Sequence, residues 1–315
     1  MRKRVEILVI ALGGNSLIKK GEKPTIAHQA KNAKATLEKL VPLIRYNNVV
    51  ITHGSGPQVG DVLLQNQLSK SKVSPLPLDV IDAEVQGELG YILEQNLQNI
   101  FTKNKIKRRV MSILTQVIVD KKDSAFKKPT KPIGSFYTKS QAEKIKKQGF
   151  KVIEQIGKGW RKVVASPKPK SIDNVEIIEN LVNKGIVIIT GGGGGIPVVK
   201  DKKNNLQGIA AVIDKDLASA CLANAIKAST LLILTDESCV YLNYQKTNQK
   251  PLRKLNIAQA QTYLKQGHFP SGSMKPKIEA SISFLKKGGK KAIITSSASL
   301  QKALKGQAGT TITKR

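Results

Sequence analysis

Five consecutive glycines separate a β-branched apolar run from a lysine flanked by two aspartates. The apolar run covers residues 186–190, the glycines occupy 191–195, and the charged group is Asp214, Lys215 and Asp216. Glycine has no Cβ, so its backbone N–H groups can approach an oxyanion closely. A lysine held between carboxylates can be fixed against a phosphoryl group. Taken alone, the stretch also fits a surface turn followed by an exposed charged turn.

The same construction recurs near the start of the chain. Apolar runs at residues 5–12 and 49–52 both end in small polar and glycine-rich turns, made of Gly13, Gly14, Asn15, Gly54, Ser55 and Gly56. Open α/β sheets bind ligands at the carboxyl ends of their strands, where such amides are exposed. A single short glycine motif is unspecific. Three of them after three apolar runs predict a site for an anion with more than one phosphate.

Two more lysines lie in segments shaped by proline and glycine. Lys131 stands between prolines, and Lys277 ends the loop predicted for residues 267–277. With Lys215 they could neutralise a phosphoryl group in transfer, a reaction that requires mainly alignment and charge stabilisation. Asp214 and Asp216 would then position lysines or the metal–nucleotide and would not act as nucleophiles. Lys131 also fits a solvated lysine, as most lysines of this chain do.

The elements that must hold these residues alternate between apolar runs and amphipathic helices. Strands are predicted at residues 5–12, 49–52, 110–119, 186–190, 230–235, 292–295 and 310–313, and helices at 25–45, 80–100, 175–183, 215–227, 258–265 and 278–287. Continuous apolar strands are typical of a sheet covered on both faces. The fold class expected is therefore α/β with a mainly parallel open sheet.

Residues 120–166 differ in character, because lysine, proline and glycine dominate them. We call this stretch the lid segment. Its length and composition predict a small protruding subdomain, with Phe136, Phe150 and Trp160 forming a minor core. Lys131 would be carried over a ligand by this lid.

Composition excludes several classes of protein. The chain of 315 residues is 40% hydrophobic, which is typical of a globular protein. No apolar stretch approaches the roughly 20 residues of a membrane span. The basic start of the chain is interrupted by Glu6 before any apolar segment of the length that a secretory signal requires. A cytoplasmic location is expected. The two cysteines form no CxxC, and the three histidines are scattered singly, so no protein-borne metal site is predicted.

The net charge of +31 raises a nucleic-acid hypothesis. The lysines are spread along the whole chain, however, and aromatic residues make up only 4% of it. No basic stretch is interleaved with stacking aromatics, as single-strand binders require. Nucleic acid is therefore not the expected partner. Neither GxxxxGK[ST] nor a complete GxGxxG occurs, which argues against a P-loop or a nicotinamide-binding domain.

Seven motifs in this order resemble the carbamate kinases, members of the amino acid kinase family. They are ALGGN (11–15), HGSGPQVG (53–60), PTKPIG (129–134), GWRKVV (159–164), GGGGIPV (192–198), AVIDKD (211–216) and GSMKPKIEA (272–280). Together they cover nearly the whole chain. The resemblance implies a three-layer αβα sandwich and the reaction of carbamoyl phosphate with MgADP to give carbamate and MgATP, in fermentative arginine breakdown.

The resemblance also assigns roles. It implies a homodimer whose N-terminal lobe, residues 1–180 with the lid at 120–166, takes the carbamoyl group, while residues 181–315 bind the nucleotide. The substrate would lie on Gly13, Gly14, Asn15, Gly54, Ser55 and Gly56, and the catalytic residues would be Lys131, Lys215, Lys277, Asp216 and Asp214. The nucleotide side would comprise Gly193, Gly194, Asp236, Tyr244 and Met274, with Mg²⁺ carried by ADP or ATP.

The chain departs from the family pattern at a few positions. Ser55 stands where the family usually has asparagine, and a serine reaches less far toward carbamate. Ala11 stands where relatives that phosphorylate amino-acid carboxylates carry lysine, and Lys131 is the expected substitute, which favours carbamate. Two alternatives stay open: a kinase of another small carboxylate or of a nucleoside monophosphate, and a basic nucleic-acid-binding protein with a degenerate kinase fold.

Overall fold

The computed structural model describes residues 5–19, 21–23, 25–155, 159–270 and 272–315. Within them, eight strands form a central sheet in the order β15-β17-β16-β12-β1-β2-β9-β3. The bounds are β15 Lys254–Asn256, β17 Thr310–Thr313, β16 Lys291–Ser296, β12 Thr230–Thr235, β1 Ile7–Leu12, β2 Asn48–His53, β9 Val187–Thr190 and β3 Val110–Ile113. Every neighbouring pair is parallel except β16 with β17.

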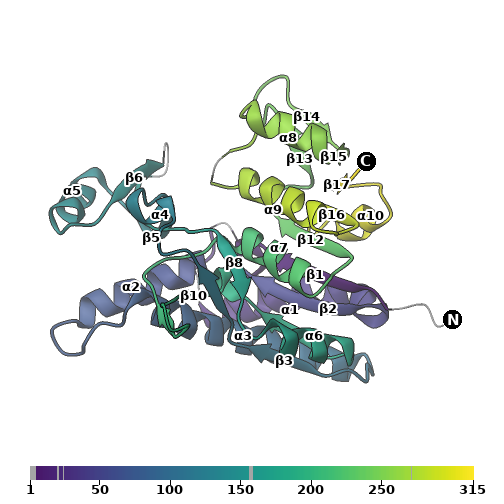
Figure 1. Cartoon of the computed structure of the whole chain (residues 1–315), viewed down its shortest axis with the longest axis horizontal. Coiled ribbons are helices and arrows are strands. Elements are labelled where there is room, and N and C mark those ends of the chain that lie inside the picture. Colours follow the sequence, from purple (N-terminus) through teal and green to yellow (C-terminus); the bar gives the residue numbers. More distant parts are fainter. Residues whose placement is uncertain (1–4, 20, 24, 156–158, 271) are drawn as a thin grey trace.

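Side chains of β1 alternate between two hydrophobic cores, one on each face of the sheet. Leu8 and Ile10 pack with α1 (Ile26–Tyr46), α3 (Leu78–Lys103) and α10 (Leu300–Leu304). Val9 and Ala11 pack with α6 (Val175–Asn183), α7 (Lys215–Ala225), α8 (Ile257–Lys265) and α9 (Met274–Lys286). This follows from the two-residue period of a strand. Helices thus cover both faces (Figure 1), and the predicted three-layer αβα architecture is confirmed.

Residues 110–119 were expected to form one strand, and that prediction was wrong. After β3 the chain leaves the central sheet, and β4 (Gln116–Val119) pairs in a second sheet of order β11-β10-β4-β8. Its other strands are β11 Leu206–Gly208, β10 Ile196–Lys200 and β8 Pro169–Ile172. The Thr115 hydroxyl donates to Ile113 O at 2.9 Å, and the Thr115 N–H donates to Gln86 Oε1 at 2.6 Å. These bonds satisfy the backbone at the break, which an apolar pattern does not reveal.

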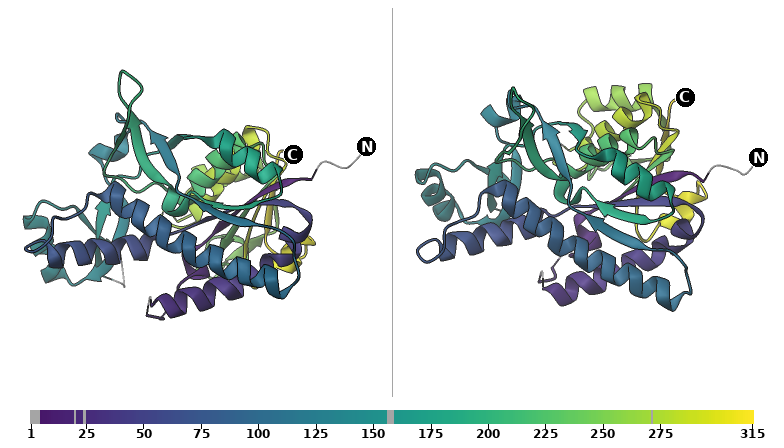
Figure 2. Two further views of the ribbon diagram at one scale, coloured as in Figure 1. Left: turned by 90° about the horizontal axis from the view of Figure 1, so that it is seen from below. Right: turned by 60° about the horizontal axis from the view of Figure 1, so that its bottom comes forward.

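The lid segment has a sheet of its own, of order β5-β7-β6. It consists of β5 (Lys131–Tyr137), β7 (Gly159–Val164) and β6 (Val152–Gln155), with α4 (Ser124–Lys127) before them and α5 (Lys139–Lys147) between β5 and β6. These elements stand away from the central sheet, beside α2 (Gly56–Ser69) (Figures 1 and 2). Gly60 of α2 touches Gly134 of β5 so closely that a Cβ on Gly60 would lie 2.0 Å from Gly134 Cα.

The expected aromatic core of the lid is not present. Phe136 and Phe150 are 47% and 46% exposed. Their rings carry cations instead: Arg161 lies over Phe136 and Lys162 over Phe150, while Lys146 lies over Trp160. Among the described residues of the lid, the buried apolar side chains are aliphatic, namely Ile133, Ala142, Ile145, Val163 and Ala165, and the side chain of Lys162 is buried beside Phe150. An aromatic ring beside a lysine or an arginine gains a cation–π contact, so aromatic content alone did not identify the core.

Helix α9 begins at Met274, four residues before the predicted start at 278. Pro276 lies in the first turn, where its missing N–H has no intrahelical partner in any case. Lys277 is therefore a helical residue and not part of a loop. No helix among the described residues has both the length and the apolar character required to cross a membrane.

Candidate active site

The glycine turns follow neighbouring strands at one edge of the sheet. In the order β12, β1, β2 and β9, the carboxyl ends lead into Asp236, Gly13, Gly54 and Gly191. β1 connects to β2 on one side, while β12 lies on its other side, and such a reversal of strand order opens a crevice in α/β folds. The sheet topology therefore brings the predicted anion-binding turns to one place.

The first two turns are in contact. The Gly54 N–H donates to Leu12 O at 3.1 Å, and a Cβ on Gly54 would lie 3.7 Å from Gly14 N. On the other side, a Cβ on Gly13 would lie 2.7 Å from Leu234 O, so only glycine fits there. Gly14 opens the short helix η1 (Gly14–Ser16), and Gly56 opens α2. The side chain of Asn15 lies outside what the structure describes.

The third turn requires glycine for conformational reasons. Gly191, Gly193, Gly194 and Gly195 all have φ between 59° and 100°, and Gly192 to Gly194 form η2 (Gly192–Gly194). A Cβ on Gly193 would lie 2.4 Å from Ser55 Oγ, and one on Gly194 would lie 2.3 Å from Ile213 O. The turn thus lies between the second glycine turn and the residue before Asp214.

Asp216 lies between the two predicted lysines of the main body. Lys215 Nζ is 2.9 Å from Asp216 Oδ1, and Lys277 Nζ donates to Asp216 Oδ2 at 2.9 Å. Only 4% of the Asp216 side chain is exposed, against 11% for Lys215 and 13% for Lys277. Lys215 Nζ also donates to Leu12 O at 3.1 Å, at the end of β1. We call Lys215, Asp216 and Lys277 the buried triad.

Charge and burial oppose each other in the triad. Burial would raise the pKa of Asp216, but Lys215 and Lys277 outweigh it and hold that pKa below the ordinary value. Burial lowers the pKa of Lys215 despite Asp216. At Lys277 burial acts in the same direction, yet Asp216, Asp214 and Asp236 together raise the pKa. The site therefore carries an ionised aspartate between two lysines whose positive ends are poorly hydrated, a setting that strengthens their attraction for an anion.

Asp214 connects the lid to the main body. Its Oδ1 accepts from the N–H groups of Asp216 and Leu217, which caps the start of α7. Its Oδ2 accepts from Lys131 Nζ at 2.8 Å, and these side chains are 16% and 30% exposed. All five residues predicted to be catalytic thus lie in two adjoining ion-pair groups.

Of the residues expected on the nucleotide side, Asp236 and Tyr244 lie in the segment after β12, and Met274 begins α9. Asp236 is close enough to contribute to the raised pKa of Lys277. The Tyr244 hydroxyl donates to Glu237 Oε1 at 2.5 Å, and this bond is the main cause that raises the pKa of Tyr244 to about 12. Met274 is the first residue of α9 and is buried, one turn before Lys277. Gly193 lies against Ser55 and not in this group.

Several supporting residues carry no sequence signal. Gln86 of α3 is buried, and its Nε2 donates to Gly192 O at 3.3 Å. Thr115 Oγ1 accepts from the Gly191 N–H at 3.0 Å and also bonds the Thr190 hydroxyl. Ser219 bonds Thr52 Oγ1 at 2.6 Å and donates to Lys215 O at 2.7 Å. Gln86 and Ser219 are ordinary polar residues within helices, and Thr115 lies at the break between β3 and β4, so only the packed structure reveals their contacts with the site.

His53, the last residue of β2, is buried next to the second glycine turn. Its Nδ1 is 3.3 Å from Gly54 O, and a Cβ on Gly192 would lie 2.3 Å from its ring. Burial lowers the pKa of His53 to about 4, and Lys215 adds to this effect. The ring is therefore neutral at neutral pH.

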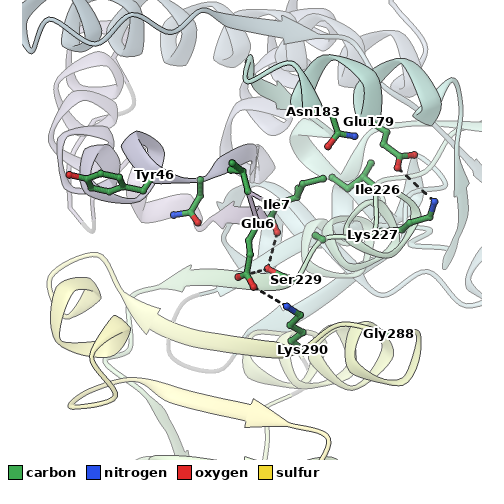
Figure 3. A pocket seen from close by; sticks show the side chains of 13 residues that line it. Glu6, Ile7, Tyr46, Glu179, Asn183, Ile226, Lys227, Ser229, Gly288 and Lys290 are labelled. Carbon is green, nitrogen blue, oxygen red and sulfur yellow. Dashed lines mark hydrogen bonds and ion pairs between the residues drawn. The ribbon is translucent and has the colours of Figure 1, made fainter. Parts of the chain in front are cut away.

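The amino ends of the strands, on the opposite side of the sheet from the glycine turns, carry a different set of residues. A cavity of about 770 Å³ there is lined by residues from the amino ends of β1 and β12 and from the carboxyl ends of helices. Figure 3 shows Glu6 bonded to Ser229 and Lys290 on one wall, with Glu179 paired to Lys227 on another. No residue of the triad lines it. The residues that the sequence predicts to be catalytic thus lie with the glycine turns, at the carboxyl ends of the strands, and not at this cavity.

Comparisons with known proteins agree with this geometry. The family model described as the amino acid kinase family matches residues 6–296. The chain is 44% identical over 312 residues to the carbamate kinase of Pyrococcus horikoshii, covering 98% of this chain and 99% of that protein. It is 43% identical to the carbamate kinase of Trichomonas vaginalis, with 97% and 98% covered.

Solved structures give the same result. The carbamate kinase of Giardia lamblia bound to AMP-PNP superposes with a TM-score of 0.91 at 38% identity, over 99% of both chains. A structure of the same enzyme bound to citric acid gives a TM-score of 0.93 at 38% identity, again over 99% of both chains. The family match, the identity of 43–44% to carbamate kinases over nearly their full length and the structural superposition all agree with the charge arrangement of the site. This chain therefore belongs to the amino acid kinase family, among the carbamate kinases.

Proposed function

We propose that this protein transfers a phosphoryl group between carbamoyl phosphate and ADP, giving carbamate and ATP. The observation that carries the proposal is the ionised Asp216 held 2.9 Å from both Lys215 and Lys277, beside the glycine turns of β1, β2 and β9. The bond between phosphorus and the carbamate oxygen breaks, and phosphorus forms a bond with a terminal oxygen of ADP. Transfer of this kind depends on alignment and on neutralised oxygens.

The two lysines act on the transferring group from fixed positions. Lys215 begins α7 and Lys277 lies in the first turn of α9, so both ammonium groups stand at helix amino ends, whose partial positive charge also favours an anion. Asp216 orders them by accepting from one and pairing with the other. Gly13, Gly14, Gly54 and Gly56 would supply backbone amides, with Ser55 and Asn15 beside them. We assign carbamate and its phosphoryl group to this region.

The lid lysine would complete the site. In the structure Lys131 pairs with Asp214, which is less exposed than the lysine. Replacing a partly exposed ion pair costs little, so an incoming carbamoyl phosphate could take over the ammonium group from Asp214. We propose that Lys131 contacts the carbamoyl phosphate and that Asp214 holds it in reach beforehand.

The nucleotide would lie along the loop that follows β12 and the start of α9, near Asp236, Tyr244 and Met274, with Gly193 and Gly194 toward the phosphates. A group of three or more His, Cys, Asp and Glu side chains able to hold a metal ion is absent from the described ranges. Mg²⁺ is commonly held by phosphates with one or two carboxylates. The donor set near the triad fits a magnesium ion brought by ADP or ATP, where it would neutralise phosphate oxygens.

We also propose a homodimer formed through the β3 edge. β3 ends the central sheet, and Gly90 of α3 approaches it so closely that a Cβ would lie 2.1 Å from Ser112 Oγ. Next to this contact, Tyr91, Met111 and Leu114 are 62%, 44% and 58% exposed. Exposed apolar side chains on an edge strand favour an interface. Met111→Glu with Leu114→Glu should convert a dimer to a monomer in light scattering; a wild-type monomer would exclude the homodimer.

The wider setting follows from the reaction. We propose that the enzyme is cytoplasmic and makes ATP from carbamoyl phosphate in arginine breakdown.

We propose lobes divided later than residue 180, because β9 pairs with β2 and β3, and β10 pairs with β4. A division near residue 210 keeps these strands together. Limited proteolysis tests this division. Cleavage between the lobes near residue 210 is expected, and cleavage near residue 180 would contradict the division.

A coupled assay with carbamoyl phosphate, ADP and Mg²⁺ tests the proposed reaction. ATP formation that requires all three is expected. The same assay with acetyl phosphate, and in reverse with acetylglutamate or a nucleoside monophosphate, tests kinases of other acceptors. Absence of ATP formation from carbamoyl phosphate would overturn the proposal. Steeply salt-dependent binding to DNA or RNA without turnover would support the nucleic-acid alternative.

A further inference from the structure

A groove of about 400 Å³ lies between α7, α8, α9 and the start of β8, and no residue of the glycine turns lines it. Figure 1 shows α8 and α9 stacked beside α7, with β8 next to α7. Its apolar lining comes from Leu217, Cys221, Leu264 and Ile282. None of the residues assigned above to carbamoyl phosphate or to the nucleotide lines it. Its volume lies in the range of small-molecule sites.

Cations surround this apolar lining on more than one side. Lys168 precedes β8, while Lys286 and Lys287 stand at the carboxyl end of α9, and all three line the groove and are exposed. Lys287 is close enough to Cys221 to act on the pKa of its thiol. Glu279 is the one carboxylate among the lining residues. An apolar pocket with a surplus of ammonium groups at its rim matches a ligand with an apolar body and an anionic head.

The groove reaches the helices that carry the triad. Leu217 lies two residues after Lys215 on α7, and Glu279 lies two residues after Lys277 on α9. A ligand between these helices would therefore touch the first turn of α7 and the second turn of α9. Because packed helices move as rigid bodies, a small change in their separation would alter the spacing of Lys215 and Lys277 about Asp216.

We propose that this groove is a second ligand site, for a small amphipathic carboxylate, and that its occupation changes turnover at the triad. The binding part is independent of the proposed reaction. The coupling part rests on it.

The two cysteines provide a direct test of binding. Cys221 lines the groove and is partly exposed, whereas Cys239 is fully buried. In the native protein, iodoacetamide should therefore alkylate Cys221 and spare Cys239, which mass spectrometry of peptides can follow. Octanoate is the probe. It should slow alkylation of Cys221 in a saturable manner, whereas acetate, which lacks the apolar body, and octanol, which lacks the charge, should not.

Variants identify which part of the groove binds which part of the probe. Lys286→Gln with Lys287→Gln should raise the octanoate concentration for half-protection by about tenfold, as expected for loss of charge-assisted contacts. Lys265→Gln on α8 removes an exposed lysine that does not line the groove, and it should leave protection unchanged. Equal protection by octanol, no protection by octanoate, or identical protection in the double variant would each overturn the site.

Turnover tests the coupling separately. With saturating octanoate, kcat in the carbamoyl phosphate assay should change by about fivefold or more, the usual range for linked sites. The change should disappear in Lys286→Gln with Lys287→Gln. Protection of Cys221 with an unchanged kcat would retain the site and overturn the coupling. An enzyme without activity on carbamoyl phosphate would overturn the proposed function and leave the alkylation result intact.

Discussion

The two ion-pair groups at the candidate active site share a charge pattern and differ in environment. In the buried triad, Asp216 is 4% exposed and its two lysines are nearly as buried. In the lid pair, Lys131 is 30% exposed and Asp214 is 16% exposed. The triad connects helices α7 and α9 of the main body, whereas the lid pair joins β5 of the lid to the cap of α7.

This difference separates a preorganised group from an exchangeable one. Breaking a buried pair leaves an uncompensated charge in a poorly hydrated place and is strongly destabilising. An exposed pair is screened by water and contributes little. In the proposed reaction, the triad would therefore keep its lysines aligned, while the lid pair would exchange Asp214 for the substrate. The predictions below test that division, starting with the largest effect.

Replacement of Lys215 by alanine should lower turnover by about 10² or more, because a preorganised charge at a developing oxyanion is lost. Initial rates of ATP formation measure this effect. Lys34→Ala, on the exposed face of α1, is the matched control and should retain full activity. Near-normal turnover of Lys215→Ala would remove this lysine from the mechanism and the triad from its assigned role.

Asp216→Asn should reduce the free energy of unfolding by about 3–5 kcal/mol, because two buried lysines then lack their shared carboxylate. Urea unfolding followed by circular dichroism gives the value. The control is Glu6→Gln, which breaks an exposed pair with Lys290 and should cost at most about 1 kcal/mol. Similar losses in both variants would mean that burial does not distinguish the triad.

Stability should rise with pH between about pH 4 and 6.5 because of His53. Its pKa is about 4 in the folded protein and 6.5 as the ordinary value. The unfolded chain binds the proton in this window while the folded protein does not, so stability is lost as pH falls from 6.5 toward 4. The contribution is on the order of 3 kcal/mol. His53→Gln should flatten this part of the unfolding-versus-pH profile; an unchanged slope would contradict a neutral buried ring.

Lys131→Ala should change stability least, by at most about 1 kcal/mol, since its pair with Asp214 is partly exposed. It should nevertheless impair use of carbamoyl phosphate more than binding of ADP. Steady-state kinetics with each substrate varied in turn will separate the two effects. Equal losses for both substrates would argue against a lid contact to the carbamoyl group, and a large loss of stability would erase the contrast with the triad.

The local sequence was informative wherever a residue type has one dominant conformational use. The apolar runs that became β1, β2 and β12 were predicted closely, because strands covered on both faces must be apolar throughout. The glycines of 191–195 were predicted as an amide-exposing turn, and four of them have the positive φ that glycine tolerates best. Lys131, Lys215 and Lys277 were selected through motifs, and the fold gathers all three.

The sequence was less informative where an outcome depended on distant partners. Residues 110–119 read as one strand, yet Thr115 bonds Gln86 and Thr190, and the chain crosses between sheets there. Phe136, Phe150 and Trp160 suggested a core, but Phe136 and Phe150 are about half exposed, and lysines and an arginine lie over all three rings. Neither result follows from local pattern, because each depends on side chains far along the chain.

Sequence alone determined the kinds of groups available: bare amides after apolar strands, and lysines next to aspartates. Tertiary structure decided which lysine pairs with which aspartate and how much water reaches each pair. Asp214 and Asp216 are two residues apart, yet one faces the lid and the other the interior between α7 and α9. The strength of an ion pair depends on its hydration and on the placement of its partner, and both are properties of the packed molecule.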